Sequence, residues 1–296
     1  MSALYAGEAQ SGSKYYEAED EGFCRRRENN CSCAFGRFHG KVAVVTGAAG
    51  NFGEACALRL AAEGASVALV DLRSSDDVRL KLVSEKPEQK FSSHVVDVRD
   101  WQAVRRVFED IVKFHGRVNY LANNAGYQGN FEGAESYDPE DFKKVMDINV
   151  NGMFYCLQAA AQVMKEDGGA IVQTASMAGI SAPPCMVAYA SSKAAVLHMT
   201  KACAKDLSKF NIRVNSVSPA FIGPGDLWTR QIEKQANASS IYYDTDPDIV
   251  KKQMIESTPM RRYGSIDEVI GPILFLFSDD ASYLTGVDIQ ITGGIN

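Results

Sequence analysis

The sequence lacks any apolar run that approaches the roughly 18 residues a membrane-spanning helix needs. It also lacks a basic stripe, since 31 Lys and Arg stand against 37 Asp and Glu and the formal net charge is -6. A protein that binds nucleic acid usually carries a basic patch for the phosphates. We therefore expect neither a nucleic acid nor a membrane as a partner.

Metal-binding and disulfide patterns are missing as well. The four histidines lie far apart, and the total of seven cysteines is odd. No spacing resembles a metal site, and scattered thiols indicate a reducing compartment. The sequence ends in Gly294-Ile295-Asn296, which is not a peroxisomal tripeptide. We expect no metal and a cytoplasmic location, and we interpret Cys31 and Cys33 as incidental thiols. The cysteines are Cys24, Cys31, Cys33, Cys56, Cys156, Cys185 and Cys203.

The first 38 residues differ from the rest of the chain. They are polar, mixed in charge and without helical or strand periodicity, and they contain no apolar segment typical of a secretory signal. The composition predicts a disordered tail at 1–38. The remaining residues, 39–296, are enough for one large domain with a buried core.

Order is predicted to begin with a dinucleotide-binding unit. Val42 to Val45 form a short β-branched strand, and a glycine-rich turn over 47–53 leads into a helix over 54–63. A second strand over 66–70 ends at Asp71. Glycines let backbone N–H groups approach a pyrophosphate at the helix N-terminus. A carboxylate at Asp71 would bond the adenosine ribose hydroxyls and repel a 2′-phosphate, so the pattern favours NAD over NADP.

The same alternation of strand and helix continues to the end of the chain. The strands read as nearly continuous apolar runs, which is typical of parallel sheets covered by helices on both faces. We predict an α/β fold with one doubly wound parallel sheet of the Rossmann type, plus a helical substrate-loop insert over 223–260. Strands are expected at 94–98, 118–122, 170–174, 213–217 and 288–291, and helices at 76–86, 104–114, 139–165, 188–209, 246–257 and 266–278.

Tyr189 and Lys193 are spaced so that they lie on one face of a helix. An ammonium near a phenol lowers the phenol pKa, which would make Tyr189 a usable proton-transfer group near neutral pH. Polar clusters stand at the predicted strand ends, where ligands of such sheets bind. These clusters are Asp97-Val98, Asn123 to Gly126, Ser176 and the stretch from Pro219 onward.

These motifs, in this order, resemble those of the short-chain dehydrogenase/reductase family, and the resemblance covers about residues 38–296. It implies that Asn149, Ser176, Tyr189 and Lys193 are catalytic and that the protein interconverts a small-molecule alcohol and its ketone as a homotetramer or homodimer. The residues that would bind NAD are Gly47, Asn51, Phe52, Gly53, Asp71, Asp97, Val98, Asn124, Ala125, Gly126, Tyr189, Lys193, Pro219 and Ile222.

The glycine-rich turn departs from the family pattern, because Asn51 stands where a glycine is usual. Asn tolerates a left-handed backbone better than other residues, so the turn is expected to persist. This departure is similar to the turn of NAD-dependent bacterial xylitol dehydrogenases within the family, and that resemblance implies a sugar alcohol as substrate. Gln128, Ser176, Met177 and Trp228 are the candidate substrate contacts, although core packing is nearly as well favoured for Met177 and Trp228.

Two alternatives remain open from the sequence. One is a 3-oxoacyl or hydroxysteroid reductase or dehydrogenase on the same fold, against which Asp71 argues if NADPH is required. The other is a non-catalytic NAD-binding scaffold or sensor, a class that usually lacks the Tyr or the Lys.

Overall fold

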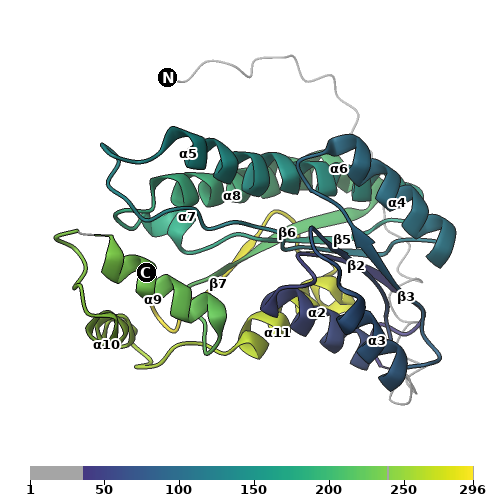
Figure 1. The fold of residues 1–296 in the computed structure, drawn as a ribbon. Helices are drawn as coiled ribbons and strands as arrows, with labels where there is room; N and C mark the ends of the chain where they lie inside the picture. Colours follow the sequence, from purple (N-terminus) through teal and green to yellow (C-terminus); the bar gives the residue numbers. More distant parts are fainter. Residues whose placement is uncertain (1–35, 239, 296) are drawn as a thin grey trace, which may run out of the picture. The chain divides into compact units, whose positions relative to one another are not determined.

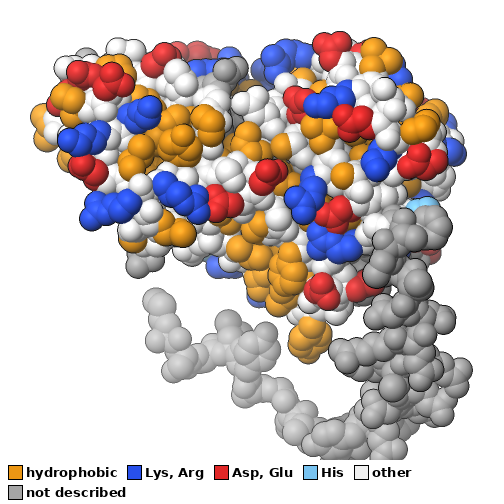
Figure 2. All heavy atoms as spheres, turned by 90° about the horizontal axis from the view of Figure 1, so that it is seen from below, with side chains coloured by type: hydrophobic (Ala, Val, Ile, Leu, Met, Phe, Trp, Pro, Cys, Tyr) orange, Lys and Arg blue, Asp and Glu red, His pale blue; other side chains and the backbone are white. Residues whose placement is uncertain are grey.

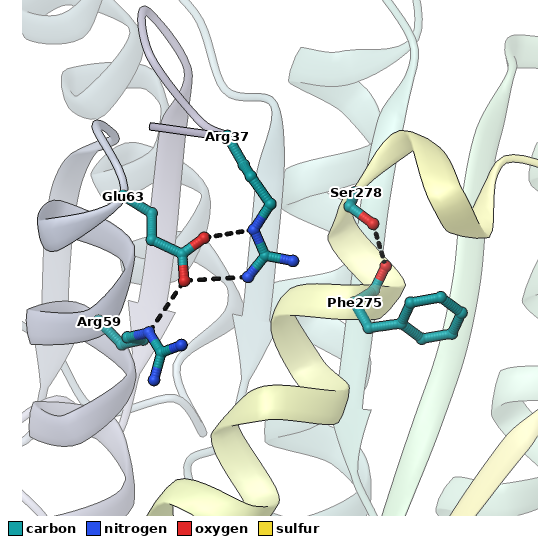
Figure 3. Close-up of polar contacts among 5 residues, drawn as sticks. All are labelled: Arg37, Arg59, Glu63, Phe275 and Ser278. Atoms are coloured by element: carbon teal, nitrogen blue, oxygen red, sulfur yellow. Dashed lines mark hydrogen bonds and ion pairs between the residues drawn. The ribbon is translucent and has the colours of Figure 1, made fainter. Parts of the chain in front are cut away.

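The computed structural model describes residues 36–238 and 240–295. The predicted tail therefore lies outside the described residues except at its last positions, and so do Cys31 and Cys33. Arg37 and Phe38 already belong to the folded domain. Phe38 is buried in the core, and Arg37 pairs with Glu63, which also accepts a hydrogen bond from Arg59 (Figure 3). The domain thus includes residues that precede the predicted boundary at 39.

The described residues form one parallel sheet of seven strands in the order β3-β2-β1-β4-β5-β6-β7 (Figure 1). The order reverses between β1 and β4, and this switch point is where ligands of doubly wound sheets bind. The predicted fold class is confirmed. The strands are β1 (Val42–Thr46), β2 (Ser66–Asp71), β3 (Phe91–Val95), β4 (Tyr120–Asn123), β5 (Gly169–Thr174), β6 (Ile212–Pro219) and β7 (Asp288–Ile291).

Alternate residues of the central strands enter two separate cores, because successive side chains of a strand point to opposite faces. Ala43 and Val45 pack on the face covered by α2 and α11, whereas Val44 packs on the face covered by α4 and α6. Figure 1 shows these two helical layers. The helices that flank the sheet are α2 (Asn51–Ala62), α3 (Asp76–Glu85), α4 (Trp101–His115), α5 (Pro139–Met146), α6 (Met153–Met164), α8 (Val187–Leu207) and α11 (Ile266–Phe277).

The strand predicted at 94–98 lies earlier in the structure, at Phe91–Val95. It is the edge strand of the sheet, and Val95 is 62% exposed, so its burial does not follow the apolar pattern of the central strands. Val96 and Val98, which suggested the strand, are buried beyond its end. The prediction was wrong here because Val96 and Val98, which line the cavity, were assigned to the strand.

The long helix predicted at 139–165 is divided. A π-helical segment, η2 (Asp147–Gly152), separates α5 from α6. A Cβ atom at Gly152 would lie 2.7 Å from the Val98 side chain. The π-helical segment therefore packs closely against the loop that follows β3. The short helix α7 (Ala178–Ser181) was not predicted, and neither were the 3₁₀ turns η3 (Ser208–Phe210) and η4 (Asp279–Ala281).

The helical insert is confirmed, and we call its two helices the lid. They are α9 (Asp226–Asn237) and α10 (Pro247–Ser257). The lid has a small core of its own, separate from the two cores of the sheet. That core contains Trp228, Ile232, Ala236, Val250 and Met254, with Phe221, Tyr243, Ile255 and Tyr263 packed against it.

Among the described residues, no helix has the length and apolar character needed to cross a membrane. On the face drawn in Figure 2, basic and acidic side chains are interspersed among hydrophobic ones. Within the same described ranges, no group of three or more His, Cys, Asp or Glu side chains is arranged to hold a metal ion.

Candidate active site

A cavity of about 1040 Å³ lies at the carboxyl ends of the central strands, with lid residues on its other side. Residues from nearly every predicted polar cluster line it, as the topology of the sheet requires. The sequence-predicted residues that line this cavity are Gly47, Asn51, Phe52, Asp71, Asp97, Val98, Asn124, Ala125, Gly126, Gln128, Ser176, Met177, Tyr189, Lys193, Pro219 and Ile222.

The turn between β1 and α2 depends on two glycines. Gly47 has a φ of 68°, and a Cβ there would lie 3.1 Å from the Ala125 Cα atom. A Cβ on Gly53 would lie 2.2 Å from the Gly47 carbonyl oxygen, so no larger residue fits. Gly53 does not line the cavity; it lets the first turn of α2 approach the loop and leaves the helix N-terminus facing the cavity, where an anion is stabilised.

Asn51 does not need the left-handed backbone that its residue type suggested. It is the first residue of α2, preceded by Gly50 with a φ of -100°. Some non-glycine residues in the described part of the chain have a positive φ, but Asn51 is not one of them. The turn persists because Gly47 takes the left-handed conformation, and the Asn51 side chain is free to line the cavity.

Asp71 ends β2 and holds the turn from the side. Its carboxylate accepts a hydrogen bond from the Ala49 N–H at 3.0 Å and another from the Arg73 N–H at 2.9 Å. The Arg73 guanidinium in turn reaches the Ala49 carbonyl at 3.2 Å. A carboxylate therefore stands beside the turn, with the Arg73 guanidinium 4.0 Å from it.

The ends of β1 and β4 are tied together by Thr46. Its hydroxyl oxygen accepts hydrogen bonds from the N–H groups of Asn124 and Ala125, at 2.8 and 3.0 Å. The same hydroxyl donates to the Asn123 amide oxygen at 3.2 Å. This network fixes the backbone of the Asn124 to Gly126 stretch at the cavity wall.

Asp97 lines the cavity but is already paired. Its carboxylate accepts hydrogen bonds from the backbone N–H and the guanidinium of Arg99. This pairing holds the pKa of Asp97 below its usual value, although partial burial opposes the effect. Val98, beside it, packs against Gly152.

Tyr189 and Lys193 face the cavity from the first turns of α8. The Lys193 ammonium lies 5.7 Å from the centre of the Tyr189 ring and donates to the Thr174 carbonyl at 2.6 Å. Ser176 is the second residue after β5 and lies beside Tyr189. The Ser176 hydroxyl also accepts from the Ala178 N–H, which fixes its position.

The pKa values of this pair differ from the sequence-based expectation. Burial raises the pKa of Tyr189, and the Ser176 hydrogen bond opposes that increase. Burial lowers the pKa of Lys193 to about 8. Lys193 is only 3% exposed and its ammonium donates to the Thr174 carbonyl, so its charge is poorly solvated. Burial therefore works against the phenolate of Tyr189 and against the ammonium of Lys193.

Asn149 lies behind the cavity rather than on its wall. It is fully buried in the π segment η2. Its side-chain amide exchanges two hydrogen bonds with the Tyr127 backbone, at 2.7 and 2.8 Å, and donates to the Ser192 hydroxyl at 3.0 Å. These bonds fix the loop after β4 against α8. The contacts observed are those of a positioning residue.

Comparison with known proteins decides the family. A family model described as "Enoyl-(Acyl carrier protein) reductase" matches residues 47–296. A solved structure of NAD⁺-bound xylitol dehydrogenase is 46% identical, with a TM-score of 0.83, over 87% of this chain and 100% of that one. The chain belongs to the short-chain dehydrogenase/reductase family.

Two further relatives are similar to this chain over nearly their whole lengths. Levodione reductase of Leifsonia aquatica is 33% identical over 87% of this chain and 95% of its own. The 3-oxoacyl-[acyl-carrier-protein] reductase of Thermotoga maritima is 36% identical over 88% and 99%. The prediction of an oxidoreductase of the short-chain dehydrogenase/reductase type is confirmed, whereas relatives with such different substrates leave the substrate of this chain undetermined.

Trp228 was predicted to contact substrate, and the structure corrects this. Its ring does not line the cavity; it lies 5.3 Å from the Tyr263 ring and 6.0 Å from the Phe221 ring, inside the lid core. An aromatic residue on an amphipathic helix satisfies core packing first. The core interpretation of Trp228 is therefore the correct one.

The lid residues that line the cavity were not predicted from the sequence. No motif marks these residues, since they are spaced along two helices whose orientation depends on tertiary packing. The amphipathic pattern of α9 was the one available signal. The missed lining residues of the lid and its connections are Arg230, Gln231, Gln235, Tyr242, Tyr243, Val250, Gln253, Met254 and Ser257.

Proposed function

We propose that this protein is an NAD-dependent dehydrogenase that interconverts a secondary alcohol, specifically a sugar alcohol such as xylitol, and its ketone. The observation that carries the proposal is one cavity shared by a glycine-rich turn with its acidic strand end and by Ser176, Tyr189 and Lys193. The likeness to an NAD⁺-bound xylitol dehydrogenase over the whole of that chain supports both the cofactor and the substrate class.

The residues of the cavity fit NAD. The open backbone at Gly47 and the N-terminus of α2 suit the pyrophosphate. The Asp71 carboxylate suits the two ribose hydroxyls of NAD and opposes the 2′-phosphate of NADP. Asn124 to Gly126 and the stretch from Pro219 to Ile222 would hold the nicotinamide half, and Asp97 with Val98 the adenine end.

In the proposed chemistry, bound NAD⁺ supplies the hydride acceptor. Tyr189 takes the proton from the substrate hydroxyl, and Ser176 donates a hydrogen bond to the same oxygen. Because burial raises the pKa of Tyr189, the phenolate needs positive charge nearby, and the Lys193 ammonium is the protein group positioned to provide it. Asn149 keeps the loop after β4 against α8 so that these groups stay aligned.

The substrate side of the cavity suits a molecule with several hydroxyl groups. Gln128 and Ser176 face it from the sheet, and Gln231 and Gln253 line it from the lid. Met177 supplies an apolar contact at the same wall. Amide groups both donate and accept hydrogen bonds, as a polyol chain requires.

A panel of alcohols assayed with NAD and with NADP tests this proposal. Xylitol and sorbitol should be oxidised with NAD at a kcat/KM well above that with NADP. A preference for a 3-oxoacyl thioester or a hydroxysteroid would refute the polyol assignment, and NAD binding without turnover of any alcohol would indicate a scaffold or sensor instead.

The proposal includes a homotetramer or homodimer in the cytoplasm. Partly exposed apolar side chains on α5 and α6, Phe142 and Phe154, are 36% and 38% exposed and would be covered by a second copy. Light scattering of the purified protein tests the subunit number, and cell fractionation tests the location. A monomer at micromolar concentration would refute the assembly.

A further inference from the structure

Hydrogen bonds from two lid side chains join the lid to the opposite wall of the cavity. The Lys234 ammonium, on α9, donates to the Gly129 carbonyl at 2.6 Å. The Tyr243 hydroxyl, between α9 and α10, donates to the Pro184 carbonyl at 3.1 Å. Gly129 lies in the loop after β4, and Pro184 lies in the connection between α7 and α8. Each acceptor directly follows a residue that lines the cavity, so both bonds lie at its edge.

The two acceptor segments are tied to each other, and together we call them the rim (residues 127–132 and 183–186). The Glu132 N–H donates to the Cys185 carbonyl at 3.0 Å. Glu132 also pairs with Met186 in an isolated parallel bridge. The rim is therefore one connected wall, and the two lid bonds reach both of its segments.

The rim is also bound to the helices behind it. Asp141 of α5 accepts hydrogen bonds from the Asn130 N–H at 2.8 Å and from the Tyr127 hydroxyl at 3.0 Å. The Asn149 amide exchanges hydrogen bonds with the Tyr127 backbone and donates to Ser192 of α8. These contacts fix the rim relative to α8, so a lid that is bound to the rim is held at a defined distance from that helix.

Lys234 makes the stronger of the two links, because its donor is charged whereas the Tyr243 hydroxyl is neutral. The ammonium lies 5.9 Å from the centre of the Tyr127 ring and 5.7 Å from that of the Phe131 ring, and both rings attract a cation. Burial lowers the pKa of Lys234, and the Asp141 carboxylate opposes that decrease. A carbonyl and two rings of the rim thus hold the end of a single lid side chain.

We infer that Lys234 is a positioning residue for hydride transfer: its bond to the rim sets the separation of lid and rim, and with it the position of an alcohol held between them. Within the described ranges Lys234 does not line the cavity, so it acts through the lid and not on the substrate. Hydride transfer needs the carbinol carbon close to its acceptor, and a displacement of about 1 Å can slow a reaction by about 100-fold. This inference rests on the proposed function and deepens it.

The test measures the pre-steady-state rate constant of NADH formation at saturating xylitol and NAD, where weaker binding no longer contributes. Lys234→Met keeps the aliphatic chain and removes the donor, and we expect the rate constant to fall about tenfold. Lys234→Arg keeps a charged donor and should restore most of the loss. Tyr243→Phe removes the neutral bond and should lower the rate constant about threefold. Lys252→Met, at an exposed position of α10, is the matched control and should leave it unchanged.

Thermal unfolding and NAD affinity show whether each variant is folded. A folded Lys234→Met protein with the wild-type rate constant overturns the inference, even if its melting temperature falls, and leaves the proposed function standing. An equal loss in Lys234→Arg overturns it too. If Lys234→Met does not fold, an unchanged rate constant in Tyr243→Phe overturns it instead. If the wild type oxidises another alcohol but not xylitol, the polyol assignment fails and that alcohol decides the inference; no turnover of any alcohol refutes both.

Discussion

The two sides of the cavity are built differently. The cofactor side consists of strand ends and a helix N-terminus that extend directly from the buried sheet. Backbone groups make hydrogen bonds that fix this wall of the cavity. The lid side consists of two helices with a small core of their own, and side chains on those helices face the cavity. The difference teaches that substrate contacts can change in the lid without disturbing the sheet. Variants that affect one side and spare the other test this division.

The largest effect is expected where the two sides meet. Tyr189→Phe removes the hydroxyl that takes the substrate proton, so turnover should fall by about 10² to 10⁴ while NAD binding stays nearly intact. Steady-state kinetics and a cofactor titration measure both. Tyr283→Phe, at a fully exposed position, is the control. Near wild-type turnover in Tyr189→Phe would contradict the assignment.

On the cofactor side, Asp71→Asn removes the charge but keeps an oxygen for the Ala49 N–H. We expect the kcat/KM ratio of NADP to NAD to rise about 10- to 100-fold, because the repulsion of a 2′-phosphate is lost. The KM for the alcohol should stay constant. Asp76→Asn removes an exposed carboxylate at the start of α3 and should change neither value. An unchanged cofactor ratio in Asp71→Asn would show that another group selects the cofactor.

On the lid side, Lys234→Met removes the hydrogen bond to the Gly129 carbonyl and loosens α9. The KM for the alcohol should increase about tenfold, which corresponds to one hydrogen bond with a charged donor. The dissociation constant for NAD should be unaffected. Lys252→Met, at an exposed position of α10, serves as the control. If Lys234→Met weakens NAD binding as much as alcohol binding, the two sides are not separable.

The smallest effect concerns stability. Lys193 is buried against the Thr174 carbonyl, and its pKa of about 8 in the folded protein lies below the 10.5 of a solvated lysine. At pH 7 the poorly solvated charge opposes folding, so Lys193→Met should stabilise the protein by about 1–3 kcal/mol. Denaturant unfolding measures the change.

The sign of the pH dependence follows from the same pKa. Between pH 8 and 10.5 the unfolded chain binds the Lys193 proton and the folded chain does not, so wild-type stability from this group rises with pH across that window. The advantage of Lys193→Met should therefore shrink above pH 8. An advantage that grows with pH would contradict a desolvated Lys193.

The cofactor side was largely predictable from the sequence, and the lid side was not. Gly47, Asp71 and the Tyr189–Lys193 pair stand at strand ends or at helical spacing, so local chemistry and topology place them together. Gln235 and Trp228 sit on one amphipathic helix, and only tertiary packing decides which of them faces the cavity. The edge strand β3 was misplaced for a similar reason, since the burial of Val98 depends on Gly152, far away in the sequence.

The π segment η2 makes the length of this part of the chain a constraint in its own right. A π turn holds an additional residue compared with an α turn. Deleting a single residue such as Val150 would restore ordinary helical winding, and each residue of an α-helix turns the chain by about 100°. Because the π turn is where the extra residue is accommodated, α5 and α6 would keep their faces after such a deletion, whereas Asn149 would leave Tyr127 and Ser192. Substitutions in η2 leave the π turn in place, whereas the loss of one residue removes the turn together with the contacts of Asn149.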